Sequence, residues 1–313
     1  MSKANRNHPI RCGSSDSAYS LMDFEREYPD DAACLDALCK AIHPDGIFCP
    51  TCQKVTKHHR ETGRPSYSCQ NCGHREHPMV GTIFQDSATS LKLWFYAAYI
   101  MSATRCGISA KQLGREIGVT YKTAWRMFHL IRKTLEDDKT PLSGKVEIDE
   151  AYYGGKNENK HVSKRKGYKG HYQDKTMVFG MVERGGRVVA RVVPSPPKSG
   201  DLLPHIRQRV LPKTMIFSDE ATFYDPLTRM GFAHGRVHHT AQVYVSGDAH
   251  TNTIEGFWSL TKNGIRGVYR NVSAKYLQMY LDEYAFRFNH RGRQAPMFDH
   301  FLRRIMKRVP AAA

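Results

Sequence analysis

The segment Lys145-Val-Glu-Ile-Asp-Glu150 decides the expected fold, because its polar and β-branched residues alternate as they do in a strand. Three further stretches downstream also have the composition of β-strands. A turn at 184–186 joins two of them as a hairpin, and residues 201–210 predict a short helix. This succession favours a mixed α/β sheet with flanking helices. Besides 145–150, the predicted strands are residues 176–183 (TMVFGMVE), 187–193 (RVVARVV) and 214–218 (TMIFS).

Acidic residues stand on two of these strands and on a later helix. Asp149 lies at the expected end of the first strand and Asp219 follows the last one, so neighbouring strand ends can bring both carboxylates together. A third acid, Glu255, lies in a segment from 250 to 262 with helical periodicity. At about 100° per residue, this helix has one polar stripe and an opposite apolar face. The stripe contains Asn252, Glu255, Ser259 and Lys262, and the apolar face contains Ile254, Phe257 and Trp258.

Three carboxylates at one point repel each other unless cations neutralise them. Hard oxygen ligands select Mg²⁺ or Mn²⁺, and two such ions about 4 Å apart support in-line phosphoryl transfer. For any single acid an ordinary surface carboxylate is the commoner explanation, and only the triple placement predicts a magnesium site. The candidate ligands are Asp149, Asp219 and Glu255. Glu150 and Glu220 would point to the opposite face of a continuing strand, so we rank them below these residues as candidate metal ligands.

Four of the eight cysteines stand in two C-x-x-C pairs, with 16 residues between the pairs. This spacing is typical of structural zinc sites, because each pair presents two thiolates from one turn and two facing turns complete a tetrahedral shell. Four cysteine ligands predict one closed, structural zinc ion. The alternative is a chance pair of reduced thiols on turns. The predicted ligands are Cys49, Cys52, Cys69 and Cys72.

The segment 107–135 predicts a helix-turn-helix. Ser109 can cap a first helix, Gly118 makes the turn, and Thr120 can cap a second helix. The second helix would present polar and basic side chains to a DNA groove. The alternative is a plain α-hairpin that only supports the neighbouring domain. The candidates for DNA contact are Tyr121, Lys122 and Arg126.

The charge balance of the chain points to a polyanionic partner. Its 313 residues include 47 Lys and Arg against 30 Asp and Glu, a net charge of +17. Such a surface favours nucleic acid first and an anionic membrane second, although a basic housekeeping protein could also carry it. Further candidates for DNA contact are Lys164, Arg165 and Lys166 within a basic loop at 156–175, and Arg266 and Arg270 after the helix of Glu255.

Neither a membrane span nor a secretory signal is expected. The longest apolar run, residues 93–101, is far shorter than the roughly 20 residues that cross a bilayer. The first residues contain no apolar segment of the kind found in signal peptides. We therefore expect a cytoplasmic protein that does not associate with a membrane.

Three segments carry a resemblance to a known family: VEIDEAYYGGK from Val146, FSDEATFY from Phe217, and HTNTIEGFWSLTKNGIRGVYRNVS from His250. They look like the catalytic blocks of bacterial insertion-sequence DDE transposases. With the cysteine pairs and the GTIF segment (81–84) ahead of them, the similarity is greatest to the ISXO-like subgroup, which has an N-terminal zinc ribbon. The resemblance covers residues 20–295 and is specific because ribbon, helix-turn-helix and catalytic blocks occur in the expected order.

This resemblance implies an RNase H-like catalytic fold in which Asp149, Asp219 and Glu255 are the three acids and Lys262 is the basic residue that follows them. Because some relatives have asparagine at the third position, Asn252, one helical turn before Glu255, is the alternative third ligand. It implies cleavage at transposon ends by water and attack of the freed 3′-OH on target DNA, with two Mg²⁺ or Mn²⁺ ions. The implied partner is double-stranded DNA, both the terminal inverted repeats and the target. A homo-oligomer of at least two copies is expected on DNA, in the bacterial cytoplasm at the nucleoid.

The expected organisation is a DNA-binding front end ahead of one catalytic body. Two other functions remain open: an inactive DNA-binding regulator with the same ribbon and helix-turn-helix, and a metal-dependent endonuclease that cleaves without joining. The three intact acids and Lys262 argue against the inactive regulator. The expected ranges are a tail at 1–18, a helix with the zinc ribbon at 19–85, the helix-turn-helix region at 86–140, and the RNase H-like domain with C-terminal helices at 141–313.

Overall fold

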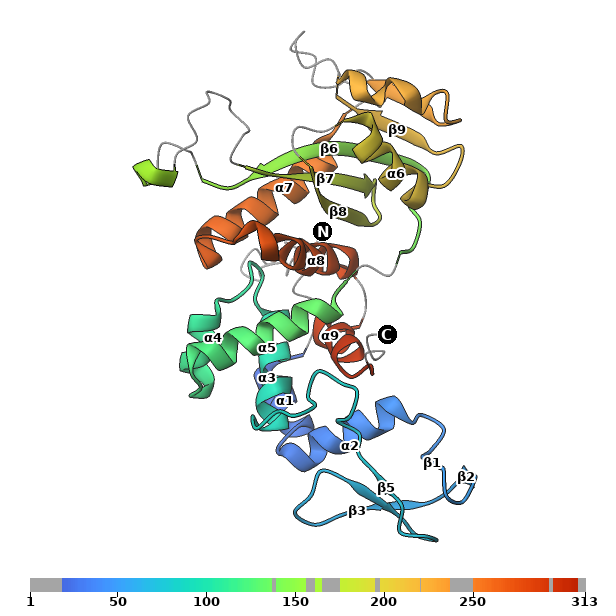
Figure 1. The fold of residues 1–313 in the computed structure, drawn as a ribbon, viewed down its shortest axis with the longest axis vertical. Coiled ribbons are helices and arrows are strands. Elements are labelled where there is room, and N and C mark those ends of the chain that lie inside the picture. Colours follow the sequence, from blue (N-terminus) through green and yellow to red (C-terminus); the bar gives the residue numbers. More distant parts are fainter. Residues whose placement is uncertain are drawn as a thin grey trace, which may run out of the picture. The chain divides into compact units, whose positions relative to one another are not determined.

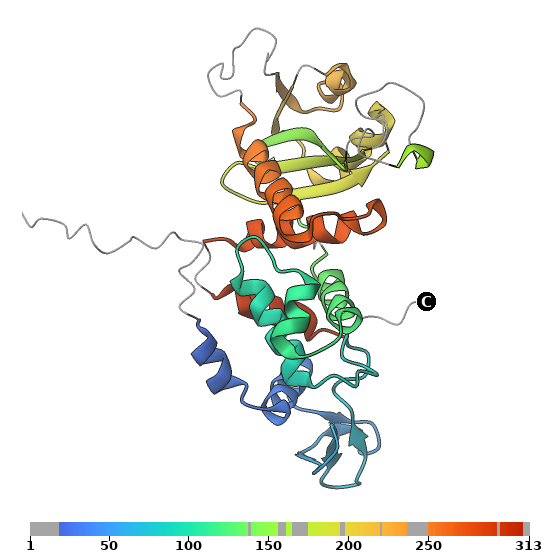
Figure 2. The same cartoon turned by 90° about the vertical axis from the view of Figure 1, so that its left-hand side faces the viewer.

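The chain forms two compact units. The first contains residues 1–134 and 290–313, and the second contains residues 135–289. Figure 1 and Figure 2 show helices and small strands in the first unit and a larger sheet with helices in the second. Among the described residues, no helix is both long and apolar enough to cross a bilayer. The computed structural model describes residues 19–136, 139–155, 161–164, 175–194, 198–219, 221–236, 250–292 and 295–308.

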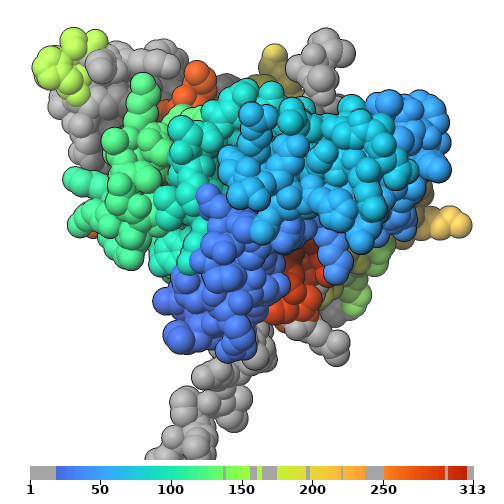
Figure 3. Space-filling view, turned by 90° about the horizontal axis from the view of Figure 1, so that it is seen from below, coloured from blue at the N-terminus to red at the C-terminus, as the bar shows by residue number. Residues whose placement is uncertain are grey.

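Two helices open the first unit, and each is fixed by a side chain at its N-terminus. The Ser20 hydroxyl accepts a hydrogen bond from the Asp23 amide, and the Asp30 carboxylate accepts one from the Ala33 amide. Short strands follow in two antiparallel sheets. In the space-filling view these helices and strands form one continuous blue-to-cyan surface (Figure 3). The elements are α1 (Leu21–Glu27), α2 (Asp31–Ile42), β1 (Phe48–Cys49), β2 (Lys54–Val55), β3 (His58–Arg60), β4 (Tyr67–Cys69) and β5 (Arg75–Glu76).

The two helices predicted for the helix-turn-helix are present in the same unit. Ser109 caps its first helix by accepting a hydrogen bond from the Gln112 amide, and Gly118 ends that helix in the left-handed conformation, with φ of 69°. Because Gly114 has no side chain, the Val119 carbonyl oxygen can approach the first helix closely. The elements are α3 (Leu91–Ala103), α4 (Ala110–Ile117) and α5 (Tyr121–Thr134).

The last helix, α9 (Met297–Ile305), belongs to the first unit although it follows the second in the sequence. It packs against α3 and α5. Its Phe298 ring centroid lies 5.7 Å from that of Tyr99 and 6.0 Å from that of Tyr28. The ranges expected from the sequence grouped this helix with the catalytic body at 141–313, whereas these aromatic contacts group it with the front end.

A five-stranded mixed sheet forms the second unit, in the order β10-β9-β6-β7-β8. The central strand β6 pairs antiparallel with β7 and parallel with β9. It continues to Tyr153, because its pairing with β7 extends as far as Thr176. Asp149 therefore lies inside the strand, which corrects the expectation that it stands at the end. The strands are β6 (Lys145–Tyr153), β7 (Thr176–Glu183), β8 (Val188–Val193), β9 (Met215–Ser218) and β10 (Ala233–Arg236).

Helices cover both faces of this sheet (Figures 1 and 2). On one face α6 and the 3₁₀ helix η4 bury strand residues such as Ile148 and Phe179. On the other face α7 and α8 bury Ala151 and Val182. The predicted mixed α/β sheet with flanking helices is thereby confirmed. The helices are α6 (Ser199–Arg209), η4 (Thr222–Leu227), α7 (Asn252–Gly264), the π-helix η6 (Ile265–Tyr269) and α8 (Ala274–His290), with a 3₁₀ turn, η3, at Val162–Lys164.

Candidate active site and zinc centre

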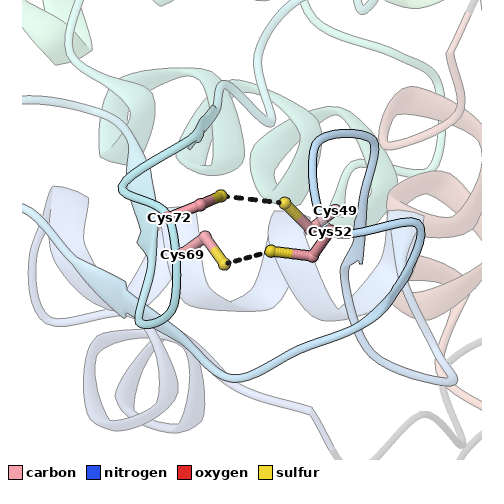
Figure 4. A group of neighbouring side chains, drawn as sticks. All are labelled: Cys49, Cys52, Cys69 and Cys72. Carbon is pink, nitrogen blue, oxygen red and sulfur yellow. Dashed lines mark hydrogen bonds between the residues drawn. The ribbon is translucent and has the colours of Figure 1, made fainter.

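The four predicted zinc ligands come together between two turns of the first unit (Figure 4). The Sγ atoms of Cys49 and Cys72 lie 3.4 Å apart, and those of Cys52 and Cys69 lie 3.9 Å apart. Sulfur ligands at a Zn–S distance of about 2.3 Å in a tetrahedron lie about 3.8 Å from each other, so the four thiols fit one zinc ion. A hydrogen bond with the Thr56 hydroxyl lowers the pKa of Cys69, whereas hydrogen bonds with the other cysteines raise the pKa of Cys52, so the thiols share protons that zinc binding would displace.

Two of the predicted catalytic acids meet on adjacent parallel strands of the second unit. Asp149 lies within β6, and Asp219 directly follows β9. The carboxylates of Asp149, Glu150 and Asp219 each place an oxygen within 4.8 Å of the others. Burial raises the pKa of Asp149 to about 6, and the charges of Asp219 and Glu255 act in the same direction. Carboxylates this close and this poorly solvated form a candidate site for a divalent cation.

Glu150 reaches this cluster from the other face of β6. Successive residues of a strand point to opposite faces, and the Tyr224 hydroxyl of η4 donates a hydrogen bond to Glu150 Oε1 on that side. Strand β9 ends at Ser218. No further β9 residue therefore stands between the carboxylates of Glu150 and Asp219, although Glu150 lies on the other face of the sheet. Burial raises the pKa of Glu150 to about 8. Glu150 thus points as expected, yet its carboxylate is close enough to share a cation with the aspartates.

Glu255 and Lys262 lie on α7, beside the cluster. Glu255 is exposed and accepts a hydrogen bond from the Thr251 hydroxyl at 3.0 Å. Its charge raises the pKa of Asp149. Burial lowers the pKa of Lys262, and the charge of Asp149 opposes that change. Both residues therefore interact electrostatically with Asp149, and Asn252 is exposed at the first turn of the same helix.

Helix α7 is fixed to β6 by side chains on one face of the strand. Residues two apart in a strand face the same side, so positions 147, 149 and 153 all point toward this helix. Their contacts follow the helix from its start to its last turns. They join Glu147 to the amides of Thr253 and Ile254, Asp149 Oδ2 to Trp258 Nε1 at 2.9 Å, and the Tyr153 hydroxyl to that of Thr261.

Gly180 on β7 leaves the room for this packing. It pairs with Asp149 across the sheet, and a Cβ atom there would lie 2.4 Å from Cζ2 of Trp258. The sequence pattern did not single out Glu147, Gly180 or Tyr224. A signal existed for Glu147 alone, because it stands two residues before Asp149 and therefore on the same face of the strand.

The residues predicted to contact DNA divide between the two units. On α5 the three candidate side chains are exposed, as the helix-turn-helix hypothesis requires. The two arginines that follow α7 are exposed as well. The α5 candidates are Tyr121, Lys122 and Arg126, and the later pair is Arg266 and Arg270; the side chain of Lys164 and the whole of Arg165, Lys166 and Glu220 lie outside the described residues.

Two models of known domains match the chain, one in each unit. A transposase zinc-ribbon domain matches residues 29–75, and an ISXO2-like transposase domain matches residues 141–289. An uncharacterized protein in transposable element ISH50 of Halobacterium salinarum is 31% identical over 268 residues, which is 80% of this chain and 89% of that protein. An uncharacterized transposase-like protein of Haemophilus influenzae is 30% identical over 103 residues, 33% of this chain and 81% of that protein.

Likeness to solved structures is low. The Mos1 strand transfer complex has a TM-score of 0.28 and 11% identity, over 63% of this chain and 73% of that chain. The family assignment therefore rests on the sequence matches, which cover both units. They define a transposase with a zinc ribbon ahead of its catalytic domain. The chain belongs to the ISXO2-like transposase family.

Proposed function

We propose that this transposase cuts DNA at the ends of its element and joins the freed 3′ ends to target DNA, using two Mg²⁺ or Mn²⁺ ions. The observation that carries the proposal is the cluster of Asp149, Glu150 and Asp219 within a transposase catalytic domain. Buried carboxylates with raised pKa values repel each other when ionised, and a hard divalent cation relieves that repulsion. When bound, two such ions activate the attacking oxygen and stabilise the leaving oxygen.

In this proposal Asp149 and Asp219 hold the ions, and α7 supplies a third ligand. Glu255 is the proposed third carboxylate, because a carboxylate binds Mg²⁺ better than a neutral amide such as Asn252. Its electrostatic effect on Asp149 supports the assignment. Glu150 is the competing ligand, because its carboxylate already lies with the two aspartates.

The basic side chains of both units would bind the DNA backbone. Lys262 is half-buried beside Asp149 and would contact a phosphate of the strand being cut. Helix α5 would receive the terminal repeats through Tyr121, Lys122 and Arg126. Because each neutralised phosphate releases counterions, binding should weaken steeply with salt. Joining two element ends to one target requires at least two copies of the chain on DNA.

Strand joining on DNA that carries the terminal repeats of the element tests the proposal. The protein is incubated with labelled end DNA, a target plasmid and Mg²⁺ or Mn²⁺. We expect cleaved ends and joined products, both absent in EDTA. Cleavage without joining would indicate a metal-dependent endonuclease. Binding without cleavage under every divalent condition would indicate an inactive regulator, and either result would overturn the proposal.

The third ligand is tested by comparing Glu255→Gln, Glu150→Gln and Asn252→Ala. The concentration of Mn²⁺ that gives half-maximal cleavage is measured for each variant. We expect the greatest increase in Glu255→Gln, because the amide binds the cation less well. Glu116→Gln is the control, since Glu116 is an exposed glutamate on α4 in the other unit. A greater increase in Glu150→Gln would assign the third position to Glu150 instead.

A further inference from the structure

Glu147 is a fully buried carboxylate on the central strand, two residues before Asp149. The proposed chemistry does not use it. Burying an ionised carboxylate is unfavourable unless hydrogen bonds and opposite charges compensate, so a glutamate at this position needs close polar partners. Among the described residues, its polar partners lie at the start of α7, at His250 just before that helix and at Arg184 in the turn after β7.

The carboxylate of Glu147 caps the N-terminus of α7. Its Oε2 accepts hydrogen bonds from the amides of Thr253 and Ile254, at 2.8 and 3.0 Å, and its Oε1 accepts one from the Thr253 hydroxyl at 3.1 Å. The first amides of a helix have no partner within it, and the positive end of the helix dipole favours a carboxylate there. Thr251 occupies the N-cap position but makes no capping hydrogen bond, and its hydroxyl donates to Glu255 instead.

A second set of contacts fixes the chain just before α7. The Arg184 guanidinium donates to Glu147 Oε1 at 2.7 Å and to the carbonyl oxygen of His250 at 2.8 Å. The same guanidinium lies 4.2 Å from the ring centroid of Phe217 on β9. His250 Nδ1 lies 3.2 Å from Glu147 Oε1. One carboxylate thus connects the central strand, the turn after β7 and the residues that begin α7.

We infer that Glu147 is a positioning residue for the metal site, which holds the first turn of α7, with Asn252 and Glu255, at a set distance from Asp149. The inference rests on the proposed function, in which α7 supplies the third ligand. Glu147 and Asp149 face the same side of one strand, so a helix capped by the first is placed relative to the second. A cap from Thr251 would also stabilise the helix but would not join it to the strand of Asp149.

Mn²⁺ binding by the full-length chain without DNA tests this inference, with Glu147→Gln as the variant. Glutamine keeps the shape and one acceptor oxygen but loses the charge and the second acceptor. The matched control is Glu283→Gln, because Glu283 is also fully buried and pairs with an arginine, Arg287 of its own helix, at 2.7 Å. We expect the Mn²⁺ dissociation constant to rise about tenfold in Glu147→Gln, as is typical of residues that orient metal ligands. In Glu283→Gln it should stay at the wild-type value.

Thermal unfolding is measured alongside, because a purely structural role would lower Tm in both variants without changing the affinity for Mn²⁺. An unchanged dissociation constant in folded Glu147→Gln would overturn the inference and leave the proposed function standing. A wild-type chain that binds no Mn²⁺ would overturn both. If Glu147→Gln does not fold, Thr253→Ala removes only the hydroxyl contact and should raise the dissociation constant about twofold. An unchanged value in that variant would contradict the positioning role.

Discussion

The zinc ribbon and the carboxylate cluster both gather side chains that repel each other when ionised, but they are assembled in different ways. The ribbon ligands come from two C-x-x-C turns separated by 16 residues, Gln53 to Ser68. The clustered acids come from β6 and from the end of β9, and α7 would add Glu255, more than a hundred residues after Asp149. The first centre depends on its own turns, whereas the second depends on how a helix packs on a sheet. Changes far from its ligands should therefore disturb the second centre more than the first.

Replacing Asp149 with Asn should have the largest effect on cleavage, and it should disable the acid site without disturbing the zinc ribbon. Cleavage of end DNA should fall at least about a thousandfold, because a two-metal site loses a ligand. Zinc content and binding of end DNA should stay at wild-type levels, because the ribbon and α5 belong to the other unit. Single-turnover cleavage and zinc analysis measure these outcomes. Asp225→Asn is the control, since Asp225 pairs with Arg236 at the surface of the same unit. Wild-type cleavage in Asp149→Asn would remove Asp149 from the site.

Replacing Cys49 with Ser should have the opposite pattern. Zinc should be lost, because structural zinc sites contribute on the order of 10 kcal/mol to the folding of the segment that holds them. Binding of end DNA should then weaken at least about tenfold, while Mn²⁺ binding by the acids stays unchanged. Metal analysis, DNA-binding titration and Mn²⁺ titration measure the three quantities. Cys106→Ser, at an exposed cysteine outside the C-x-x-C pairs, should retain zinc. Loss of Mn²⁺ binding in Cys49→Ser would show that the two centres are coupled.

Local patterns predicted most of the fold. The strand at 176–183 matches β7, and α4 and α5 begin directly after Ser109 and Thr120, the residues predicted to cap them. Strand β10 was not predicted, because Ala233-His-Gly-Arg236 contains no β-branched residue, and its parallel pairing with β9 is a tertiary contact. The length of β6 was underestimated for the same kind of reason, since pairing with β7 extends it.

The candidate site was only partly predictable. The sequence indicated that Asp149 and Asp219 could meet, because both are associated with segments that have recognisable strand patterns. The alternation around Glu147 predicted a strand but not what covers it; α7 packs on the face of Glu147, and Glu147 is buried. No short-range pattern shows that a helix more than a hundred residues later will need this carboxylate as its cap. The same applies to Gly180, whose missing side chain matters only because Trp258 lies against it.

Replacing Gly180 with Ala tests the dependence of the acid site on packing without changing a polar group. The new Cβ would lie 2.4 Å from Trp258 Cζ2 and 2.9 Å from Ile254 Cδ1, so α7 must move. We expect the free energy of unfolding to fall by about 1–3 kcal/mol, as for other overpacked cores, and the Mn²⁺ dissociation constant to rise. Urea unfolding and Mn²⁺ titration measure these effects. Gly200→Ala is the control, because no atom lies within 4 Å of the added Cβ there. Unchanged stability and affinity in Gly180→Ala would show that α7 tolerates displacement.

Replacing Arg126 with Ala should have the smallest effect, because one exposed cation on α5 supports neither metal centre. Affinity for end DNA should fall several-fold, and the slope of log affinity against log salt should decrease by about one, as expected for one lost phosphate contact. Titrations at several salt concentrations measure both quantities, with zinc content and Mn²⁺ binding unchanged. Lys213→Ala, at an exposed lysine between α6 and β9, is the control for loss of one positive charge. An Arg126→Ala chain with the same salt slope as wild type would favour the plain α-hairpin over a DNA-contacting helix-turn-helix.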